Sequence, residues 1–274
     1  MDRLTRENLL DCMRSRRHYG TTGGANGRMI IDLSAKFDAA ATVYSDDPNL
    51  FENAKGTQAT TAKMGDIVHL PNGEMHLSGS VETTSAIERI EVFNGERLIH
   101  TVRPFSPSEL GSRIRVLWEG AEYRGRFRQV IWDGTAQITG NQVLAAQPVN
   151  FLNHDKTLER DGNTLSWEAL TTGNFGGVDI QLADALSGQL AINTPLVEFE
   201  IPIGDIGQDD LLFDESGRLP RFIRVFRLPE TLTCTSHRFS VAVDLSATGD
   251  NPIYIRLTQE DGTRAWTSPI YVYR

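Results

Sequence analysis

The sequence has few of the residues that cross-link a fold or hold a metal through sulfur. Only two of its 274 residues are cysteine, Cys12 and Cys234, and they lie far apart without a CxxC spacing. The sequence therefore indicates neither a disulfide framework nor a cysteine-based zinc site. So low a cysteine content is compatible with a reducing compartment.

Long apolar stretches are also missing. No run approaches the roughly 20 apolar residues that a membrane-spanning helix needs. The N-terminal stretch MDRLTRENLLDCMRSRR is charged throughout and lacks the apolar segment of a signal peptide. We therefore expect no membrane partner and favour a cytoplasmic location.

Basic residues do not exceed acidic ones. The chain has 27 Lys and Arg against 36 Asp and Glu, which gives a formal net charge of −9 at pH 7. A protein that mainly binds a nucleic-acid backbone needs clustered excess positive charge. The charge balance therefore predicts no nucleic-acid partner.

Strand-like patterns dominate what is present. Residues 4–17 predict one short helix, with Thr5 as its N-cap, and residues 34–63 show weak periodicity that we interpret as a loop or insertion. From residue 64 the apolar period is two, and Asn94-Gly95 predicts a hairpin turn. The fold class expected is mainly β, an antiparallel β-sandwich-like architecture with one short N-terminal helix. The β-rich region, residues 64–274, has room for two packed sheets or subdomains.

Metal-binding motifs of the HxH, DxH and HExxH kinds are absent from the sequence, as are the GxSxG and Walker motifs. The weak candidates for a metal site are Asp66, His69 and His76, which flank a predicted turn. A hairpin could bring them together, but a zinc site needs three ligands on rigid elements. We favour the alternative that these are solvated side chains at strand ends.

A locally basic stretch, EYRGRFRQVIWDG, covers residues 122–134. If it forms a strand, Arg124, Arg126 and Arg128 share one face, because side chains alternate with period two. These arginines could bind an anion or a phosphorylated ligand. The alternative, which we favour, is a solvated sheet face.

The four tryptophans, Trp118, Trp132, Trp167 and Trp266, are spread one to each strand-like region. A carbohydrate platform would gather several aromatic rings on one exposed face. Because tryptophan in β proteins more often packs in the core, we favour a core role over sugar binding.

Three stretches together resemble one family. RSRRHYGTTGG (residues 14–24), LWEGAEYRGRFRQVIWDGTAQITGNQV (117–143) and TRAWTSPIYV (263–272) are similar, in this order, to segments of the DUF3604 family of bacterial proteins. That family looks related to the PHP metal-dependent phosphoesterases. MGD (64–66) and IERIEVFNGERLI (87–99) also fit. The matches are scattered motifs over most of the chain.

The resemblance implies an organisation for the chain. Metal-binding HxH and DxH motifs precede the RRxYxTTG segment in the family, and they are absent here. Residues 1–33 are therefore expected to be the remnant helix, turn and strand of an upstream PHP-like domain. Because no catalytic or metal residue matches, no cofactor is expected for this chain, and a divalent metal only in a full-length relative. The residues that match the motif, expected at a domain seam or site rim, are Arg16, Arg17, Tyr19, Thr21 and Thr22.

Three hypotheses follow. The leading one is a non-catalytic, β-rich C-terminal region that packs on or gates a metal-dependent hydrolase domain, in cis or as a separate chain. The second is a module that binds a glycan or phosphoryl ligand, and the third is a metal-dependent hydrolase in its own right. The resemblance places the first ahead of the others.

Overall fold

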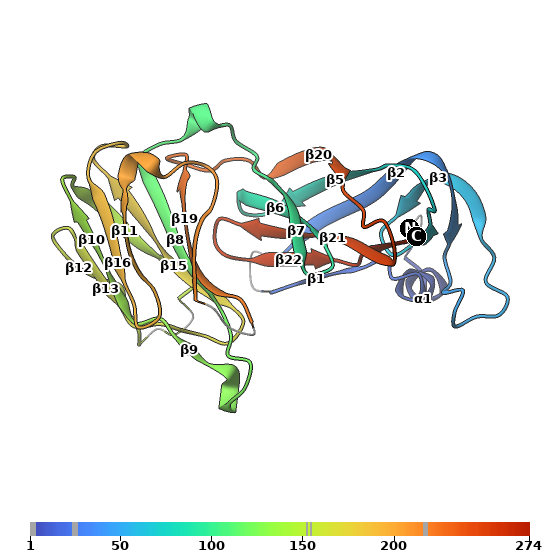
Figure 1. The fold of residues 1–274 in the computed structure, drawn as a ribbon, viewed down its shortest axis with the longest axis horizontal. Coiled ribbons are helices and arrows are strands. Elements are labelled where there is room, and N and C mark those ends of the chain that lie inside the picture. Colours follow the sequence, from blue (N-terminus) through green and yellow to red (C-terminus); the bar gives the residue numbers. More distant parts are fainter. Residues whose placement is uncertain (1–3, 24–26, 152, 154, 216–218) are drawn as a thin grey trace. The chain divides into compact units, whose positions relative to one another are not determined.

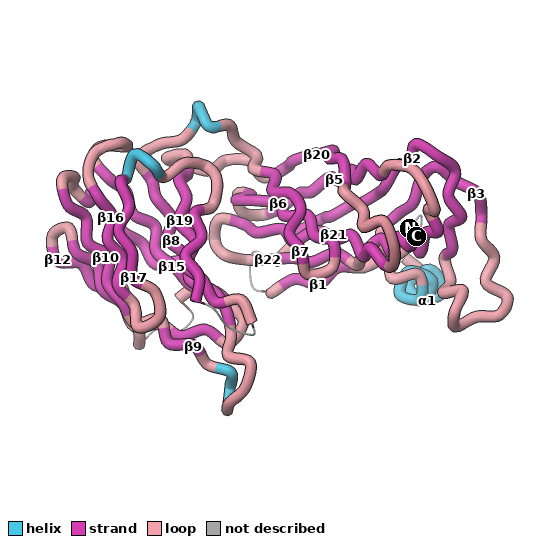
Figure 2. The backbone as a smooth tube through the Cα atoms, viewed as in Figure 1, coloured by secondary structure: helices cyan, strands magenta, loops and turns pink. Residues whose placement is uncertain are grey.

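The computed structural model describes residues 4–23, 27–151, 153, 155–215 and 219–274. Strands dominate the described chain, with one α-helix near the N-terminus, and almost all strand pairs are antiparallel (Figure 2). The expected fold class is therefore confirmed. No helix in these described ranges is long and apolar enough to cross a membrane.

The chain divides into two compact units. Unit 1 consists of residues 1–104 and 233–274, and unit 2 of residues 105–232. Unit 2 is thus inserted in the sequence between the two segments that form unit 1. Residues 1–33 lie in unit 1, while residues 64–274 contribute to both units.

Unit 1 combines the α-helix with eleven of the strands in the described part of the chain. Its elements are α1 (Arg6–Arg14), β1 (Tyr19–Thr21), β2 (Met29–Tyr44), β3 (Thr57–Lys63), β4 (Ile67–His69), β5 (Met75–Thr83), β6 (Ile87–Asn94), β7 (Arg97–Val102), β20 (Ser236–Val243), β21 (Asp250–Gln259), β22 (Arg264–Thr267) and β23 (Ile270–Tyr273). Figure 1 shows their arrangement.

These strands form one sheet, in the order β1-β22-β21-β23-β4-β2-β5-β20, with β3 on β2 and the β6–β7 hairpin on β21. The pair β4–β23 is parallel. Gly95, between β6 and β7, has φ +61°, so the predicted Asn-Gly turn is confirmed. Leu33, Leu77 and Leu257 are fully buried members of the unit's apolar core.

The prediction of a loop over residues 34–63 is wrong for most of that range. Strand β2 runs to Tyr44 and β3 covers Thr57–Lys63, which leaves residues 45–56 between them. Along β2 the buried side chains alternate with exposed or half-buried ones, as at Leu33, Ala35 and Phe37. Small alanines occupy several core-facing positions here, so the apolar pattern of this long strand is faint in the sequence.

Unit 2 contains twelve strands in the described part of the chain and three short 3₁₀ turns. Its elements are η1 (Pro107–Glu109), β8 (Arg113–Gly120), η2 (Arg126–Arg128), β9 (Val130–Ile131), β10 (Gly134–Thr139), β11 (Val143–Val149), β12 (Glu159–Asp161), β13 (Thr164–Trp167), β14 (Leu170–Thr171), β15 (Phe175–Leu182), β16 (Gln189–Asn193), β17 (Glu198–Pro202), η3 (Ile203–Asp205), β18 (Leu211–Glu215) and β19 (Arg221–Leu228).

Unit 2 is a β-sandwich. One five-stranded sheet has the order β12-β13-β10-β16-β17 and the other β11-β15-β8-β19-β18, while β9 and β14 form a separate pair. Apolar side chains from both sheets form one core. Trp118 of β8 stacks on Trp167 of β13 with ring centroids 4.8 Å apart. Trp132 is also fully buried, so a core role for these three tryptophans is confirmed.

A buried charged cluster joins two strands of this sandwich. Arg115 of β8 lies directly opposite Asp179 of β15, and its Nε and Nη2 lie 2.6 and 2.7 Å from the two carboxylate oxygens. Arg113 donates to the same carboxylate through Nε and Nη2. Arg115 and Asp179 are 1% and 8% exposed, so one largely buried carboxylate binds two guanidiniums at once.

Candidate functional site

Helix α1 leads directly into the first family-like motif. Thr5 caps its N-terminus by accepting a hydrogen bond from the Asn8 backbone N–H, as predicted. The helix ends at Arg14, earlier than expected, and Arg16 takes a left-handed φ of +56°. The Arg16 side chain donates to the backbone oxygens of Gly65 and Ser45, at 2.8 and 2.9 Å. Arg16 is therefore engaged by the backbone of unit 1.

The other motif residues also bind within unit 1. The Tyr19 hydroxyl donates to the Met29 carbonyl oxygen at 2.5 Å. Thr22 and Arg264 exchange two hydrogen bonds, from Thr22 N to Arg264 O at 2.9 Å and from Arg264 N to Thr22 Oγ1 at 3.0 Å. Thr21 pairs with Ala265 in the β1–β22 ladder. The first motif is thus held against the closing motif, TRAWTSPIYV.

These two motifs also border a hollow in unit 1 of about 590 Å³. Arg16 and Tyr271 both line it, and the guanidinium carbon of Arg16 lies 6.0 Å from the centroid of the Tyr271 ring. Asp47 and Asp250 contribute acidic groups to its wall. Segments from both ends of the chain therefore meet at one concave surface.

The structure does not bring the metal candidates together. Asp66 is buried and accepts hydrogen bonds from Lys63 N at 2.8 Å and from Arg17 Nη2 at 3.2 Å. His69 stacks on Tyr273, and His76 lies exposed on β5 opposite Ala242 of β20. Within the described residues no three His, Cys, Asp or Glu side chains are grouped to hold a metal ion. The hypothesis of a metal site on Asp66, His69 and His76 is therefore not supported.

The basic stretch is a loop and not a strand. Residues 121–129 connect β8 to β9 and extend away from both sheets of unit 2 (Figure 1). Gly125, Phe127 and Arg128 all have positive φ, which is incompatible with a strand. The prediction that Arg124, Arg126 and Arg128 share a sheet face is therefore wrong.

All three arginines of this loop are nevertheless exposed. The guanidiniums of Arg124 and Arg126 lie over the rings of Tyr123 and Phe127, with centroid distances of 5.5 and 5.0 Å. The exposed Phe127 holds a left-handed conformation that is uncommon outside glycine. Anion binding by these arginines stays a prediction.

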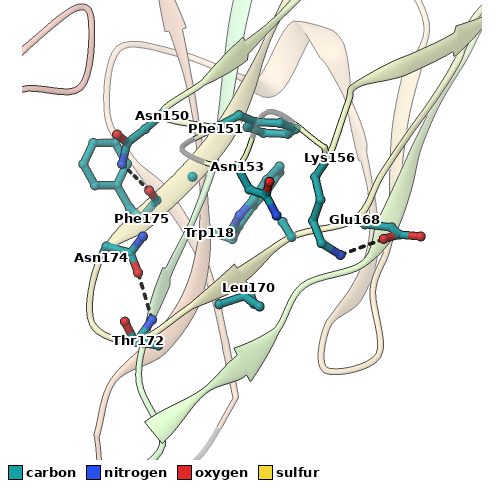
Figure 3. A pocket seen from close by; sticks show the side chains of 12 residues that line it. Trp118, Asn150, Phe151, Asn153, Lys156, Glu168, Leu170, Thr172, Asn174 and Phe175 are labelled. Carbon is teal, nitrogen blue, oxygen red and sulfur yellow. Dashed lines mark hydrogen bonds and ion pairs between the residues drawn. The ribbon is translucent and has the colours of Figure 1, made fainter. Parts of the chain in front are cut away.

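Unit 2 contains a pocket that no sequence pattern had indicated (Figure 3). Its volume is about 260 Å³. The lining residues come from β8, β14, β15 and the segments around them and are Trp118, Asn150, Phe151, Asn153, Lys156, Glu168, Ala169, Leu170, Thr172, Asn174, Phe175 and Gly176. The three asparagines beside aromatic residues were the available signal, but only the fold gathers them.

One ion pair sits at the edge of this pocket. Lys156 Nζ lies 2.6 Å from Glu168 Oε2. The hydrogen bond between them raises the pKa of Lys156 and lowers the pKa of Glu168. Both groups are therefore charged at neutral pH, and together they contribute no net charge to the pocket.

Comparisons of the chain with protein-family models, curated proteins and solved structures found no match.

Proposed function

We propose that this chain is the non-catalytic, β-rich C-terminal region of a DUF3604-like, PHP-related protein and that it packs on or gates a metal-dependent hydrolase domain. The hydrolase domain would be joined in cis or supplied as a separate chain. The single observation that carries the proposal is the apolar side of α1, which is turned to solvent directly before the family-like motif.

The apolar residues of α1 have the spacing of a buried helix face. Leu10 and Met13 are three residues apart and Leu9 and Met13 four, so these side chains lie on one side of the helix. They are 47% (Leu9), 40% (Leu10) and 59% (Met13) exposed, and none of the nine helical residues is buried. An amphipathic helix normally buries this side, so a partner surface is the expected cover.

Helix α1 is fixed to unit 1 at its C-terminal end, which favours a role in binding a partner over a helix that moves freely. Nine residues are too few for a stable isolated helix in water, because nucleation is costly and few hydrogen bonds repay it. Arg16 nevertheless fixes the C-terminal end of the helix to Gly65 and Ser45. The hollow lined by Arg16 and Tyr271 gives the partner a concave surface in the same unit.

The experiment tests a PHP-like, metal-dependent hydrolase domain as the binding partner of the full chain. The reading frame upstream of the Met1 codon is cloned if it carries HxH and DxH motifs, and its product is co-expressed with the full chain. We expect a stable complex that the double variant Leu9→Asp, Met13→Asp weakens by about thirtyfold or more, as loss of a buried apolar anchor does. Isothermal titration calorimetry measures the dissociation constant.

The control is the double variant Leu50→Asp, Leu98→Asp, which changes exposed apolar residues of the same unit outside α1. It should bind like the wild type. Equal binding by the α1 variant would refute the proposed surface. Substantial Mn²⁺- or Zn²⁺-dependent hydrolysis of p-nitrophenyl phosphate by the purified 274-residue chain would refute the non-catalytic role.

A further inference from the structure

We infer that the pocket of unit 2 shown in Figure 3 binds a neutral saccharide unit. The inference does not depend on the proposed docking through α1, because the pocket belongs wholly to unit 2. It rests on three features: an indole N–H without an acceptor, a set of neutral hydrogen-bonding groups, and a balanced charge.

The indole of Trp118 lies in the pocket wall. Trp132 and Trp167 donate their indole N–H groups to Thr171 Oγ1 at 2.9 Å and to Trp132 O at 2.7 Å. The N–H of Trp118, a residue 1% exposed, has no acceptor among the described residues. An indole N–H can only donate, so a ligand oxygen in the pocket that Trp118 lines is a fitting acceptor.

Glycine at position 176 allows the Trp118 indole to take this place in the pocket wall. A methyl group on residue 176 would lie 2.8 Å from Trp118 Nε1, closer than packing allows. Gly176 also lines the pocket. The absence of a side chain at this position therefore lets the Trp118 indole pack against residue 176 within the pocket wall.

The polar groups around the pocket suit hydroxyl partners. Asn153 and Asn174 each use Oδ1 to accept a backbone N–H within the protein, which leaves their Nδ2 donors without an acceptor among the described residues. Thr172 offers an exposed hydroxyl, and Glu168 Oε1 is an acceptor. A sugar hydroxyl both donates and accepts, so it matches this mixed set.

Charge distinguishes a neutral sugar from a phosphoryl ligand. Among the described lining residues Lys156 is the cation, and Glu168 pairs with it at 2.6 Å. Because the ammonium is already paired with the adjacent carboxylate, its attraction for a ligand anion is largely cancelled. The exposed Leu170 and the half-buried Phe151 supply apolar surface for the C–H groups of a sugar ring.

The test follows the four indole N–H signals of the full chain by NMR during titration with glucose, galactose, mannose, xylose or N-acetylglucosamine. Concentrations up to about 50 mM detect millimolar dissociation constants. Trp118→Phe identifies the Trp118 signal. We expect a saturable shift of that signal with at least one of these sugars, weakened about tenfold by Glu168→Gln and by Thr172→Val.

Matched controls are Glu200→Gln and Thr135→Val, at exposed positions of the same sandwich, which should leave the dissociation constant unchanged. The inference is overturned if no neutral sugar shifts the signal, or if the shift survives both pocket substitutions. Binding of glucose 6-phosphate alone, strengthened by Glu168→Gln, would identify an anion site and also overturn it. None of these outcomes bears on the docking of α1.

The pH dependence gives a further expectation. Lys156 is the charged group that faces Glu168, and Asp133 acts on Lys156 from nearby. Because the ion pair lowers the pKa of Glu168 below its ordinary value of 4.5, the carboxylate persists from neutral pH into mild acid. Sugar affinity should therefore be constant from pH 8 to about pH 5 and fall only below pH 4.5, as the same titration can measure.

Discussion

The Asp179→Asn variant should lose about 3 kcal/mol of the free energy of unfolding of unit 2. Asparagine keeps the shape of the side chain but removes the negative charge that Arg113 and Arg115 share. Arg115 is 1% exposed, so its guanidinium stays out of water without the opposing carboxylate. A buried charge that loses its counter-ion is costly because desolvation is no longer offset.

Urea denaturation followed by tryptophan fluorescence is the appropriate measurement. Three of the four tryptophans lie in the sandwich core, so their signal reports mainly on unit 2. Asp209→Asn is the matched control, because Asp209 is exposed in the same unit and its neutralisation should change stability by less than about 0.5 kcal/mol.

A double variant separates the charge effect from a general loss of packing. Arg115→Met removes the deepest guanidinium, so adding it to Asp179→Asn should cost less than the sum of the two single changes. Strict additivity, or an Asp179→Asn midpoint equal to that of the control, would contradict the buried ion cluster as a source of stability.

Local patterns predicted the parts of the fold that local chemistry decides. The N-cap at Thr5 and the turn at Asn94-Gly95 depend on a few neighbouring residues, and the structure confirms both. The apolar alternation after residue 64 likewise predicted a mainly β fold. The return of residues 233–274 to unit 1 could not be predicted, because the pairing of β5 with β20 and of β6 with β21 depends on long-range contacts.

The errors have identifiable physical causes. In β2, core-facing Ala35 and Ala41 carry too little apolar signal to extend the strand pattern past residue 34. In residues 122–128, arginines at alternate positions imitate a strand face, but Gly125, Phe127 and Arg128 take positive φ. Alternation of charge alone is therefore weak evidence for a strand, since loops also tolerate it.

The pocket of unit 2 was the least predictable feature. Trp118 and Trp167 could be assigned to a core from their residue type, but the placement of the Trp118 indole in the pocket wall depends on Gly176 of a neighbouring strand. Lys156 and Glu168 are twelve residues apart and meet only because the chain folds back between them. Neither juxtaposition has a sequence motif.

The Gly65→Ala variant should release the N-terminal segment from unit 1. Gly65 has φ +88°, and a Cβ there would lie 2.1 Å from the Ser15 carbonyl oxygen and 2.7 Å from the Arg16 backbone. Both neighbours are main-chain atoms, so no side chain can rotate away to relieve the clash. The variant therefore has to displace the end of α1 and the hydrogen bond from Arg16 Nε to Gly65 O.

Limited trypsin digestion measures this displacement, because Arg14, Arg16 and Arg17 lie in the segment that would be freed. The matched control is Gly95→Ala, whose φ of +61° imposes a similar backbone strain of about 1–2 kcal/mol while the nearest atom to its Cβ is 4.0 Å away. We expect cleavage after these arginines to be about tenfold faster in Gly65→Ala than in the control, equivalent to about 1.4 kcal/mol.

Equal cleavage rates in the two variants would contradict this expectation. They would show that glycine is required at position 65 only for its positive φ, and not for its close contact with the end of α1. The expected result is faster cleavage in Gly65→Ala with an unchanged free energy of unfolding of the sheet. It would show that the MGD segment holds the first motif in place through contacts with Ser15 and Arg16. Because the hydrogen bond from Arg16 to Gly65 fixes the end of α1, the same variant should also weaken binding to the proposed hydrolase partner. Loss of binding without altered folding of the sheet would then link this glycine, through the helix, to the proposed docking surface.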